Sequence, residues 1–235
     1  MAKHDANGKR VMEVDLRGFR LSKLNTPEYS YLKWLLYWPI YMLCFSILER
    51  GWIRPYYHPT YCIVDDWIPF CEWFVLPYMI WFVFVFFSIF YTALYEKEVF
   101  VKTMKYVAFT YTFALIVFVV YPNCQELRPE TFARDNVLTR FMALFYQFDT
   151  NTNVLPSVHV LGTLASLAAY LNCEKFQGIG WKIALWVLSI LICVSTVFLK
   201  QHSILDMVAA IPICIVADAL FFRKKKSSAK SNTEK

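Results

Sequence analysis

The chain has 235 residues, of which 58% are hydrophobic, 19% aromatic and only 18% charged. Soluble domains are about 45–50% apolar and about 25% charged, so this composition excludes a disordered chain, a collagen-like fibre and most soluble enzymes. The formal net charge is +6, but Lys and Arg gather at the ends of apolar runs and in the tail. We therefore attribute the charge to orientation in a membrane and expect no nucleic-acid partner.

Six apolar runs follow a polar N-terminal segment, residues 1–28. Each approaches the roughly 20 residues that a helix needs to cross the hydrocarbon core. In chain order the runs are Tyr29–Leu48, Trp73–Tyr95, Tyr106–Tyr121, Val154–Cys173, Ile183–Leu199 and Ser203–Phe222. The first, third and fifth are shorter or interrupted. We predict an all-α, polytopic integral membrane protein, a six-helix transmembrane bundle over residues 29–222, with a basic tail at residues 223–235.

The basic residues predict the orientation of these spans. With six spans, eighteen of the 24 lysines and arginines lie in the N-terminal segment, the second-to-third and fourth-to-fifth connections and the tail, and six lie on the other side. The positive-inside rule then places both termini in the cytoplasm. The segment Gly51–Glu72 falls on the extracellular or lumenal side and is rich in aromatic residues. We interpret it as an interfacial aromatic belt, with a lid over a lipid-binding cleft as the alternative.

The remaining metal and disulfide signals are weak. His58 and the pair Asp65-Asp66 lie in the aromatic segment and form only a weak metal-ligand pattern. The seven cysteines include no Cys-x-x-Cys pair, and most are interpreted as small core residues. Only Cys62, Cys71 and Cys124 fall on the side that faces an oxidising compartment. The sequence neither excludes nor indicates a disulfide among them.

Ionisable side chains inside apolar spans are costly, so they indicate function by default. Three stand out: His159 in the fourth predicted span, and His202 and Asp206 at the start of the sixth. The predicted topology brings them to the same membrane face as Arg128 and Lys200. Because His202 and Asp206 are four residues apart, they share a helix face, and the carboxylate can fix the tautomer of the imidazole.

A phosphate-binding pocket is the chemistry that this set of residues favours. Pro156 and Ser157 form the first turn of the fourth span, where free N–H groups and the helix dipole bind anions. Arg128 and Lys200 add positive charge for a phosphate. Two alternatives remain at this point. One is a zinc site with both histidines and the aspartate as ligands; the other is a non-catalytic membrane protein whose polar residues only hold the spans together.

Three sequence motifs resemble those of a known family. Arg128-Pro129, Leu155-Pro-Ser-Val-His159-Val and Ser195-Thr-Val-Phe-Leu-Lys-Gln-His202-Ser-Ile-Leu-Asp206 resemble, in this order, the three motifs of the type-2 phosphatidic acid phosphatase superfamily. The similarity covers roughly Tyr106 to Phe222, and the six-span layout agrees with it. It implies a substrate that is a lipid phosphate or phospholipid.

The resemblance also implies a role for each motif residue. His202 attacks phosphorus and forms a phosphohistidine, Asp206 orients and activates His202, and His159 protonates the leaving alkoxide. Arg128 and the N–H groups near Ser157 hold the phosphoryl oxygens. No metal and no cofactor are then required.

Three positions depart from the family pattern. Tyr121 stands where the first motif begins with lysine, Val158 replaces the glycine of the second, and Thr196 replaces the arginine of the third. Lys200 is the candidate to replace one of the two lost cations. The Lys-Gln-His form resembles the branch that includes inositol phosphotransferases of sphingolipid synthesis. We therefore expect a lipid phosphatase, with a phosphotransferase that moves a phospho-head-group onto ceramide or diacylglycerol as the alternative.

Overall fold

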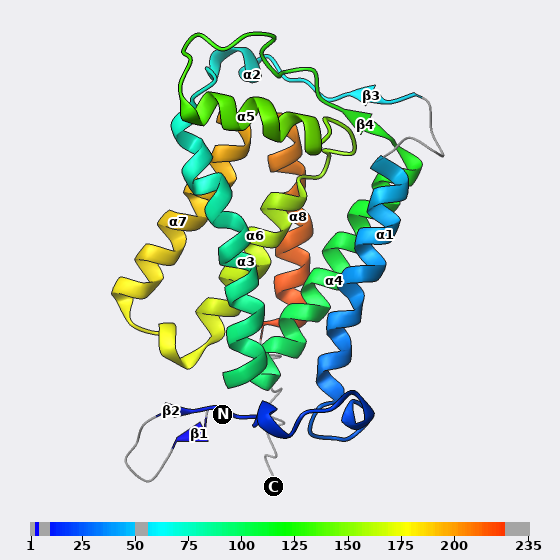
Figure 1. Ribbon diagram of the computed structural model, residues 1–235, viewed down its shortest axis with the longest axis vertical. Coiled ribbons are helices and arrows are strands. Elements are labelled where there is room, and N and C mark those ends of the chain that lie inside the picture. Colours follow the sequence, from blue (N-terminus) through cyan, green and yellow to red (C-terminus); the bar gives the residue numbers. More distant parts are fainter. Residues whose placement is uncertain (1–2, 5–9, 50–55, 224–235) are drawn as a thin grey trace, which may run out of the picture.

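The computed structural model describes residues 3–4, 10–49 and 56–223, and the described chain is mainly helical. Long helices run side by side along the long axis of the molecule (Figure 1). They are α1 (Tyr37–Glu49), α3 (Val75–Tyr95), α4 (Lys97–Val120), α6 (Val158–Asn172), α7 (Ile179–Phe198) and α8 (Ile204–Phe221). The 3-10 helix η3 (Ser30–Leu36) leads directly into α1. The expectation of an all-α fold is confirmed.

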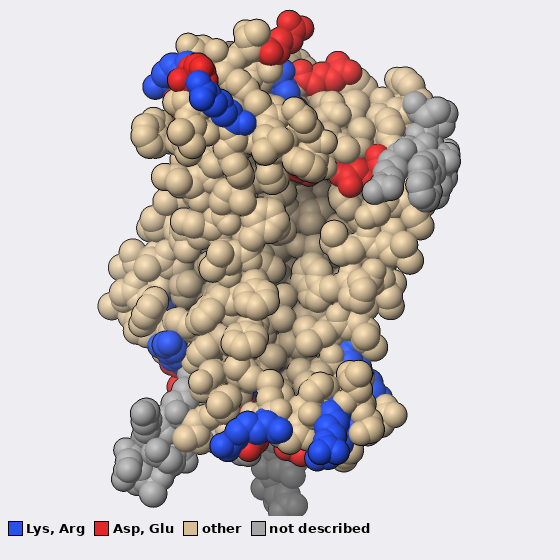
Figure 2. Space-filling model, viewed as in Figure 1, with Lys and Arg blue, Asp and Glu red and all other residues tan. Residues whose placement is uncertain are grey.

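Among the described residues, five helical segments are long and apolar enough to cross a membrane: Ser30–Glu49, Glu72–Tyr95, Lys97–Val120, Ile179–Phe198 and Ile204–Phe221. The remaining long helix, α6, has only 15 residues. At 1.5 Å per residue it is about 22 Å long, against a hydrocarbon core of about 30 Å. Five helices thus support the prediction of a multi-pass membrane protein by their length and composition. Figure 2 agrees, because charged side chains on the face shown gather at the two ends of the molecule.

Helix α6 is the central element of the bundle, since it packs against α3, α4, α7 and α8. Small residues let it do so: Gly162, Ala165, Ser166 and Ala169 are all buried. Small side chains allow helix backbones to approach one another closely in a membrane. A short helix enclosed by longer ones is suited to hold residues at a fixed depth.

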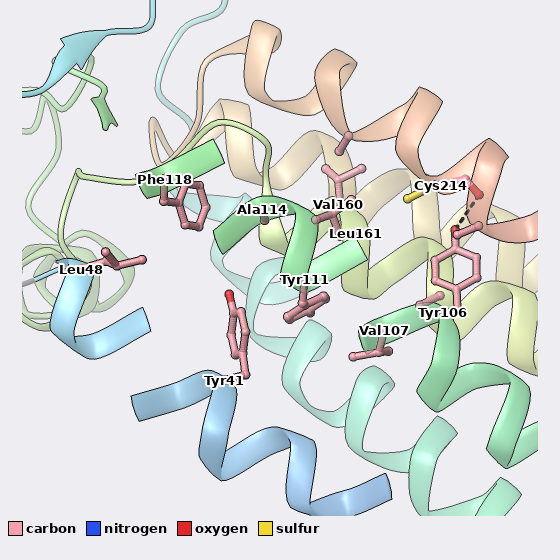
Figure 3. Packing of buried hydrophobic residues seen from close by; sticks show 13 residues of the cluster. Tyr41, Leu48, Tyr106, Val107, Tyr111, Ala114, Phe118, Val160, Leu161 and Cys214 are labelled. Atoms are coloured by element: carbon pink, nitrogen blue, oxygen red, sulfur yellow. Dashed lines mark hydrogen bonds between the residues drawn. The ribbon is translucent and has the colours of Figure 1, made fainter. Parts of the chain in front are cut away.

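Buried tyrosines join the helices around α6. Tyr41 of α1 packs edge-on against Tyr111 of α4, with ring centroids 4.9 Å apart (Figure 3). Tyr106 of α4 donates a hydrogen bond of 3.1 Å to the carbonyl of Cys214 in α8, drawn in Figure 3. Each phenol thus contributes a large apolar ring to the core, and those of Tyr106 and Tyr111 also donate a hydrogen bond to a carbonyl of a neighbouring helix.

Three predicted span boundaries were wrong. Helix α6 begins at Val158 rather than Val154, so Pro156 precedes the helix and Ser157 is its N-cap rather than part of its first turn. Helix α4 begins at Lys97 rather than Tyr106, and a single residue, Glu96, separates it from α3. Helix α7 begins at Ile179 rather than Ile183. The apolar pattern excluded these first turns because they carry Lys97, Lys102 and Lys182. A lysine can remain on a helix while its long side chain extends toward water.

The end of the molecule that carries the candidate site is built from shorter elements. Helix α5 (Val137–Phe148) lies across this end of the bundle, with α2 (Val64–Trp67) nearby (Figure 1). Strand β3 (His58–Pro59) pairs in parallel with β4 (Asn123–Cys124), and η4 (Glu72–Phe74) precedes α3. The sequence did not predict α5. Asn136 and Thr139 form its capping box, and Met142 is buried against Val75 and Tyr78.

The opposite end carries both the N-terminal elements and the end of α8 (Figure 1). Strands β1 (Lys3–His4) and β2 (Arg10–Val11) pair in antiparallel fashion. The 3-10 helices η1 (Leu16–Gly18), η2 (Leu21–Lys23) and η5 (Glu174–Phe176) follow along the chain. Arg223 pairs with Asp218 at 3.8 Å. Of the predicted N-terminal segment, aromatic segment and basic tail, residues 1–2, 5–9, 50–55 and 224–235 lie outside the described residues.

Candidate active site

The first turn of α8 holds His202 and Asp206 together. The Nδ1 atom of His202 lies 3.3 Å from Oδ2 of Asp206. That same oxygen accepts a 2.9 Å hydrogen bond from the N–H of Ser203, which closes a capping box at the helix start. The N–H of His202 donates to the carbonyl of Thr196 in α7. Because the carboxylate holds Nδ1, the other ring nitrogen, Nε2, is the one available for chemistry.

His159 of α6 lies beside His202, with ring centroids 5.6 Å apart and an interplanar angle of 68°. Aromatic rings of α3 enclose it: the centroids of Tyr78 and Trp81 are 4.7 and 4.3 Å away. The Nε1 of Trp81 donates to the His159 carbonyl at 3.0 Å. His159 Nε2 is buried and has no hydrogen-bond partner among the described residues. A buried polar atom of this kind is unusual and consistent with an atom kept for a ligand.

Ser157 connects the starts of α6 and α8. Its side chain caps α6 by accepting from the N–H of Val160. Its own N–H donates to the carbonyl of Asp206 at 3.0 Å. The first turn of α6, whose N–H groups lack partners within the helix, is thereby fixed beside the two histidines. This is the geometry in which a helix start can bind an anion.

The structure places Arg128 near the histidines but engages its two terminal nitrogens with protein acceptors, while its buried Nε has no partner among the described residues. Its nitrogens donate to the carbonyls of Tyr146, Asp149 and Thr150 at 2.8–3.1 Å, and to Oε1 of Gln201 at 2.5 Å. The guanidinium also lies over the Tyr146 ring, 4.4 Å from its centroid. Burial lowers the pKa of Arg128, while Asp149 opposes that shift. In this structure Arg128 therefore neutralises the carbonyl end of α5.

Lys200 points away from the two imidazole rings. Its Nζ donates to the carbonyl of Asp65 at 2.7 Å, and its backbone adopts a φ of 53° in the turn before His202. Burial lowers the pKa of Lys200, and the carboxylates of Asp65 and Asp66 oppose that shift. The lysine thus holds α2 against the turn that carries His202.

Asp65, which the sequence offered only as a weak metal ligand, caps α8 from a distant part of the chain. Its Oδ1 accepts from the N–H of Ile204 at 2.8 Å, and its Oδ2 accepts from the hydroxyl of Ser203 at 2.6 Å. A carboxylate is favoured at this position because it faces the positive end of the helix dipole.

Asp149, Gln201 and Tyr78 were not singled out by sequence reasoning. Oδ2 of Asp149 accepts from Nε2 of Gln201 at 2.8 Å and from the hydroxyl of Tyr78 at 3.2 Å. Burial raises the pKa of Asp149, and the nearby charges of His202 and Arg128 oppose that shift. A second carboxylate therefore lies within the electrostatic reach of His202. The polar sequence around Asp149 carries no periodic signal that could have indicated it.

The positions that depart from the family motifs supply no cation to this site. The Tyr121 ring stacks on His58 with centroids 4.5 Å apart. Thr196 directs its hydroxyl to the carbonyl of Cys193 at 2.7 Å. The Val158 carbonyl accepts from the hydroxyl of Tyr111 at 3.3 Å.

Within the described ranges, no three His, Cys, Asp or Glu side chains come together in a way that could hold a metal ion. The set of three ligands that the zinc alternative needs is therefore not formed there. All seven cysteines are free thiols. Comparison of the chain with protein-family models, curated proteins and solved structures finds no match.

Proposed function

We propose that the protein is a membrane phosphoesterase of the type-2 phosphatidic acid phosphatase superfamily. It removes phosphate from a lipid phosphate or pyrophosphate through a phosphohistidine, without a metal. The observation that carries the proposal is the triad geometry: the carboxylate of Asp206 is 3.3 Å from His202 Nδ1, and the His159 ring centroid is 5.6 Å from that of His202. The motif order and the helix start at Ser157 support it.

The first half of the reaction transfers phosphorus to the protein. The lone pair of His202 Nε2 attacks phosphorus while the bond to the lipid oxygen breaks, and its electron pair goes to the departing alkoxide. The His159 imidazolium gives that oxygen a proton. Asp206 stabilises the positive charge that grows on His202. A covalent intermediate splits one difficult displacement into two easier ones, and general acid help contributes about 10²–10⁴-fold.

The second half restores the enzyme. Water attacks the phosphohistidine and gives its proton to His159, which is now neutral. The P–N bond breaks, its electron pair returns to Nε2 of His202, and phosphate leaves. Substrate oxygens bind to the N–H groups at the start of α6. The rest of catalysis is positioning and charge stabilisation.

We also infer the membrane arrangement that this chemistry needs. Helix α6 counts as a sixth crossing, both termini are cytoplasmic, and the site faces the extracellular or lumenal side. The distribution of Lys and Arg supports this orientation. The shortness of α6 is consistent with a site set below the head groups, in reach of water.

The test of this function is capture of the intermediate. Purified protein mixed with phosphatidic acid labelled in its phosphate, with chelator present, is expected to retain an acid-labile phosphate on His202. His202→Ala is expected to retain none and to lose turnover. His58→Ala is the matched control, since His58 packs on Tyr121 outside the site. Full turnover by His202→Ala would reject the proposal.

A phosphotransferase is the second candidate, favoured by the charge of the site. The terminal nitrogens of Arg128 and the ammonium of Lys200 are engaged with protein carbonyls. Of these donors, the buried Nε of Arg128 alone has no partner in the described ranges, and Asp149 adds a carboxylate near His202. A phosphomonoester carries nearly two negative charges and a diester carries one, so a site poor in cations suits a diester head-group donor better. A lipid alcohol such as ceramide or diacylglycerol then replaces water as the second nucleophile. Free phosphate as the sole product at saturating acceptor would exclude transfer.

A further inference from the structure

An apolar groove runs along the side of the bundle between α3 and the segment formed by η3 and α1. Figure 2 shows the molecule hollowed between α3 and α1 on this face. The groove has a volume of about 690 Å³. All its lining side chains are apolar, and on α3 they recur at helical spacing. On α3 these are Trp81, Phe82, Val85, Phe86, Ile89, Phe90, Ala93 and Leu94, and opposite them lie Leu32, Leu35, Trp38 and Met42.

One end of the groove reaches the candidate active site. Trp81 lines the groove and also packs against His159 at a tilt of 46°, with ring centroids 4.3 Å apart. Phe82 lines the groove and approaches the same ring edge-on at 6.5 Å. The hydrogen bond from Trp81 Nε1 to the His159 carbonyl fixes the indole in this position. The indole of Trp81 therefore separates this end of the groove from the His159 imidazole by the thickness of one ring.

The other end is closed by the N-terminal segment. Leu16 and Phe19 contribute to the lining beside Ala93 and Leu94. The N–H of Glu13 donates to the carbonyl of Leu94 at 2.9 Å, which ties this segment to the end of α3. From Trp81 to Leu94 the helix rises about 20 Å at 1.5 Å per residue. That exceeds half of the roughly 30 Å hydrocarbon core.

The proportions of the groove indicate its occupant. The apolar lining extends along about 20 Å of α3 at 1.5 Å per residue, and it offers no charged or hydroxyl group to a protein partner. A single extended hydrocarbon chain fits a long, narrow space without polar atoms.

We propose that this groove holds an acyl chain of the substrate lipid, with the phosphate at His159 and the chain end near Leu16 and Phe19. The proposal rests on the proposed function and adds to it the substrate class: a lipid phosphate with at least one long chain. Because this end is closed, we expect the groove to select substrates by the length of their acyl chain. Chains long enough to fill it contact the whole lining, and shorter chains do not.

Photo-crosslinking of the wild-type protein tests where the chain lies. The probe is a phosphatidic acid with 16-carbon chains and a diazirine near the end of one chain, in phosphatidylcholine vesicles. Crosslinks are expected on Ile89–Leu94 and on the segment 16–19. A second lateral groove, between α4 and α8, touches Pro156 and is lined by Phe109, Phe113, Ala209 and Ile213. Crosslinks confined to that groove, or spread evenly over the lipid-facing surface, would overturn the proposal.

A matched pair of variants tests the same point by kinetics. Ala93→Phe fills the closed end of the groove, and Ala209→Phe fills the rival groove by the same change. Ala93→Phe is expected to lower, at least tenfold, the ratio of kcat/KM for 16-carbon over 8-carbon phosphatidic acid. Ala209→Phe is expected to leave that ratio unchanged, and the reverse result would overturn the proposal. If the wild type turns over neither lipid, the proposed function fails, whereas the crosslinking pattern still decides where the chain lies.

Discussion

At the scale of single residues, the chemistry of the site depends on which polar atoms are held and which are left for a ligand. Asp206 holds Nδ1 of His202, while Nε2 of His159 is buried with no partner in the described ranges. Arg128 and Lys200, the two predicted cations, are engaged with backbone carbonyls. Binding of a phosphate by Arg128 would use its unpartnered Nε or require its terminal nitrogens to exchange some of these carbonyls for phosphoryl oxygens.

Asp149 makes the stability of the protein depend on pH in a predictable direction. Burial raises its pKa above that of an unfolded chain, about 3.9. A raised pKa means that the folded state binds the proton of this carboxyl more tightly than the unfolded state does. The contribution of Asp149 to the free energy of unfolding is therefore most favourable below pH 4 and is lost as pH rises through the folded-state pKa. His202 and Arg128 limit this effect, because their positive charges favour the ionised form.

We therefore predict that Asp149→Asn melts at a higher temperature relative to wild type as pH increases from 4 to 8. The difference in Tm, measured in one detergent at each pH, should grow and then level off above the folded-state pKa. Comparison with wild type cancels the titration of groups that both proteins share. A difference that stays constant or shrinks with pH would contradict this view of Asp149.

Sequence reasoning located the histidines and Asp206, but it could not find their supporting residues. The four-residue spacing predicted that His202 and Asp206 share a helix face, but His202 lies before α8, whose N-cap is Ser203. The two side chains meet across the capping box instead. Loops bring Asp65, Asp149 and Gln201 to the site. The course of a loop leaves no periodic pattern in the sequence, so these positions could not be predicted. Asp65, for example, caps a helix that begins 139 residues later along the chain.

At the scale of elements, the site depends on how closely α3, α4 and α6 approach at Gly162. A Cβ atom added at Gly162 would lie 2.5 Å from the Tyr111 hydroxyl and 3.1 Å from Trp81. Both are rings fixed by neighbours: Trp38 packs edge-on against Tyr111, and Trp81 packs against His159. Neither ring can give way without moving a helix or the imidazole.

Gly162→Ala is therefore expected to destabilise the protein by about 1–3 kcal/mol, the usual cost of overpacking a core. It should also lower turnover, since Trp81 is displaced against His159. Gly180→Ala is the matched control, because a Cβ there meets nothing within 4 Å. Thermal unfolding and phosphate release on the same preparations measure both effects. Equal behaviour of the two variants would mean that close packing at Gly162 does not position the site.

The apolar runs of the sequence predicted the long helices well, because each of these helices carries apolar side chains along most of its length. It missed α5 for a physical reason. That helix has 12 residues, too few to resemble a span, and it carries polar residues such as Arg140 and Gln147 among its apolar ones. Its stability comes from the Asn136 cap and from packing on α3, and packing of this kind is not visible in the sequence.

At the scale of the whole molecule, function depends on which end faces the cytoplasm. The candidate site lies at the end that carries α5, and the N-terminal elements and the end of α8 lie at the other (Figure 1). The positive-inside rule assigns the second end to the cytoplasm. Two strongly exposed apolar residues mark the two ends: Leu21 of η2 is 82% exposed and Val137 of α5 is 80% exposed.

Leu21→Cys and Val137→Cys are therefore a matched pair for a test of orientation. In sealed vesicles whose outer surface is the cytoplasmic one, a membrane-impermeant thiol reagent should label Leu21→Cys above the parent chain. Val137→Cys should be labelled only after detergent opens the vesicles. The reverse pattern would place the two histidines on the cytoplasmic side. Labelling of both in sealed vesicles would mean that the two ends are not separated by a membrane, and a site that takes its lipid from the bilayer would then have no basis.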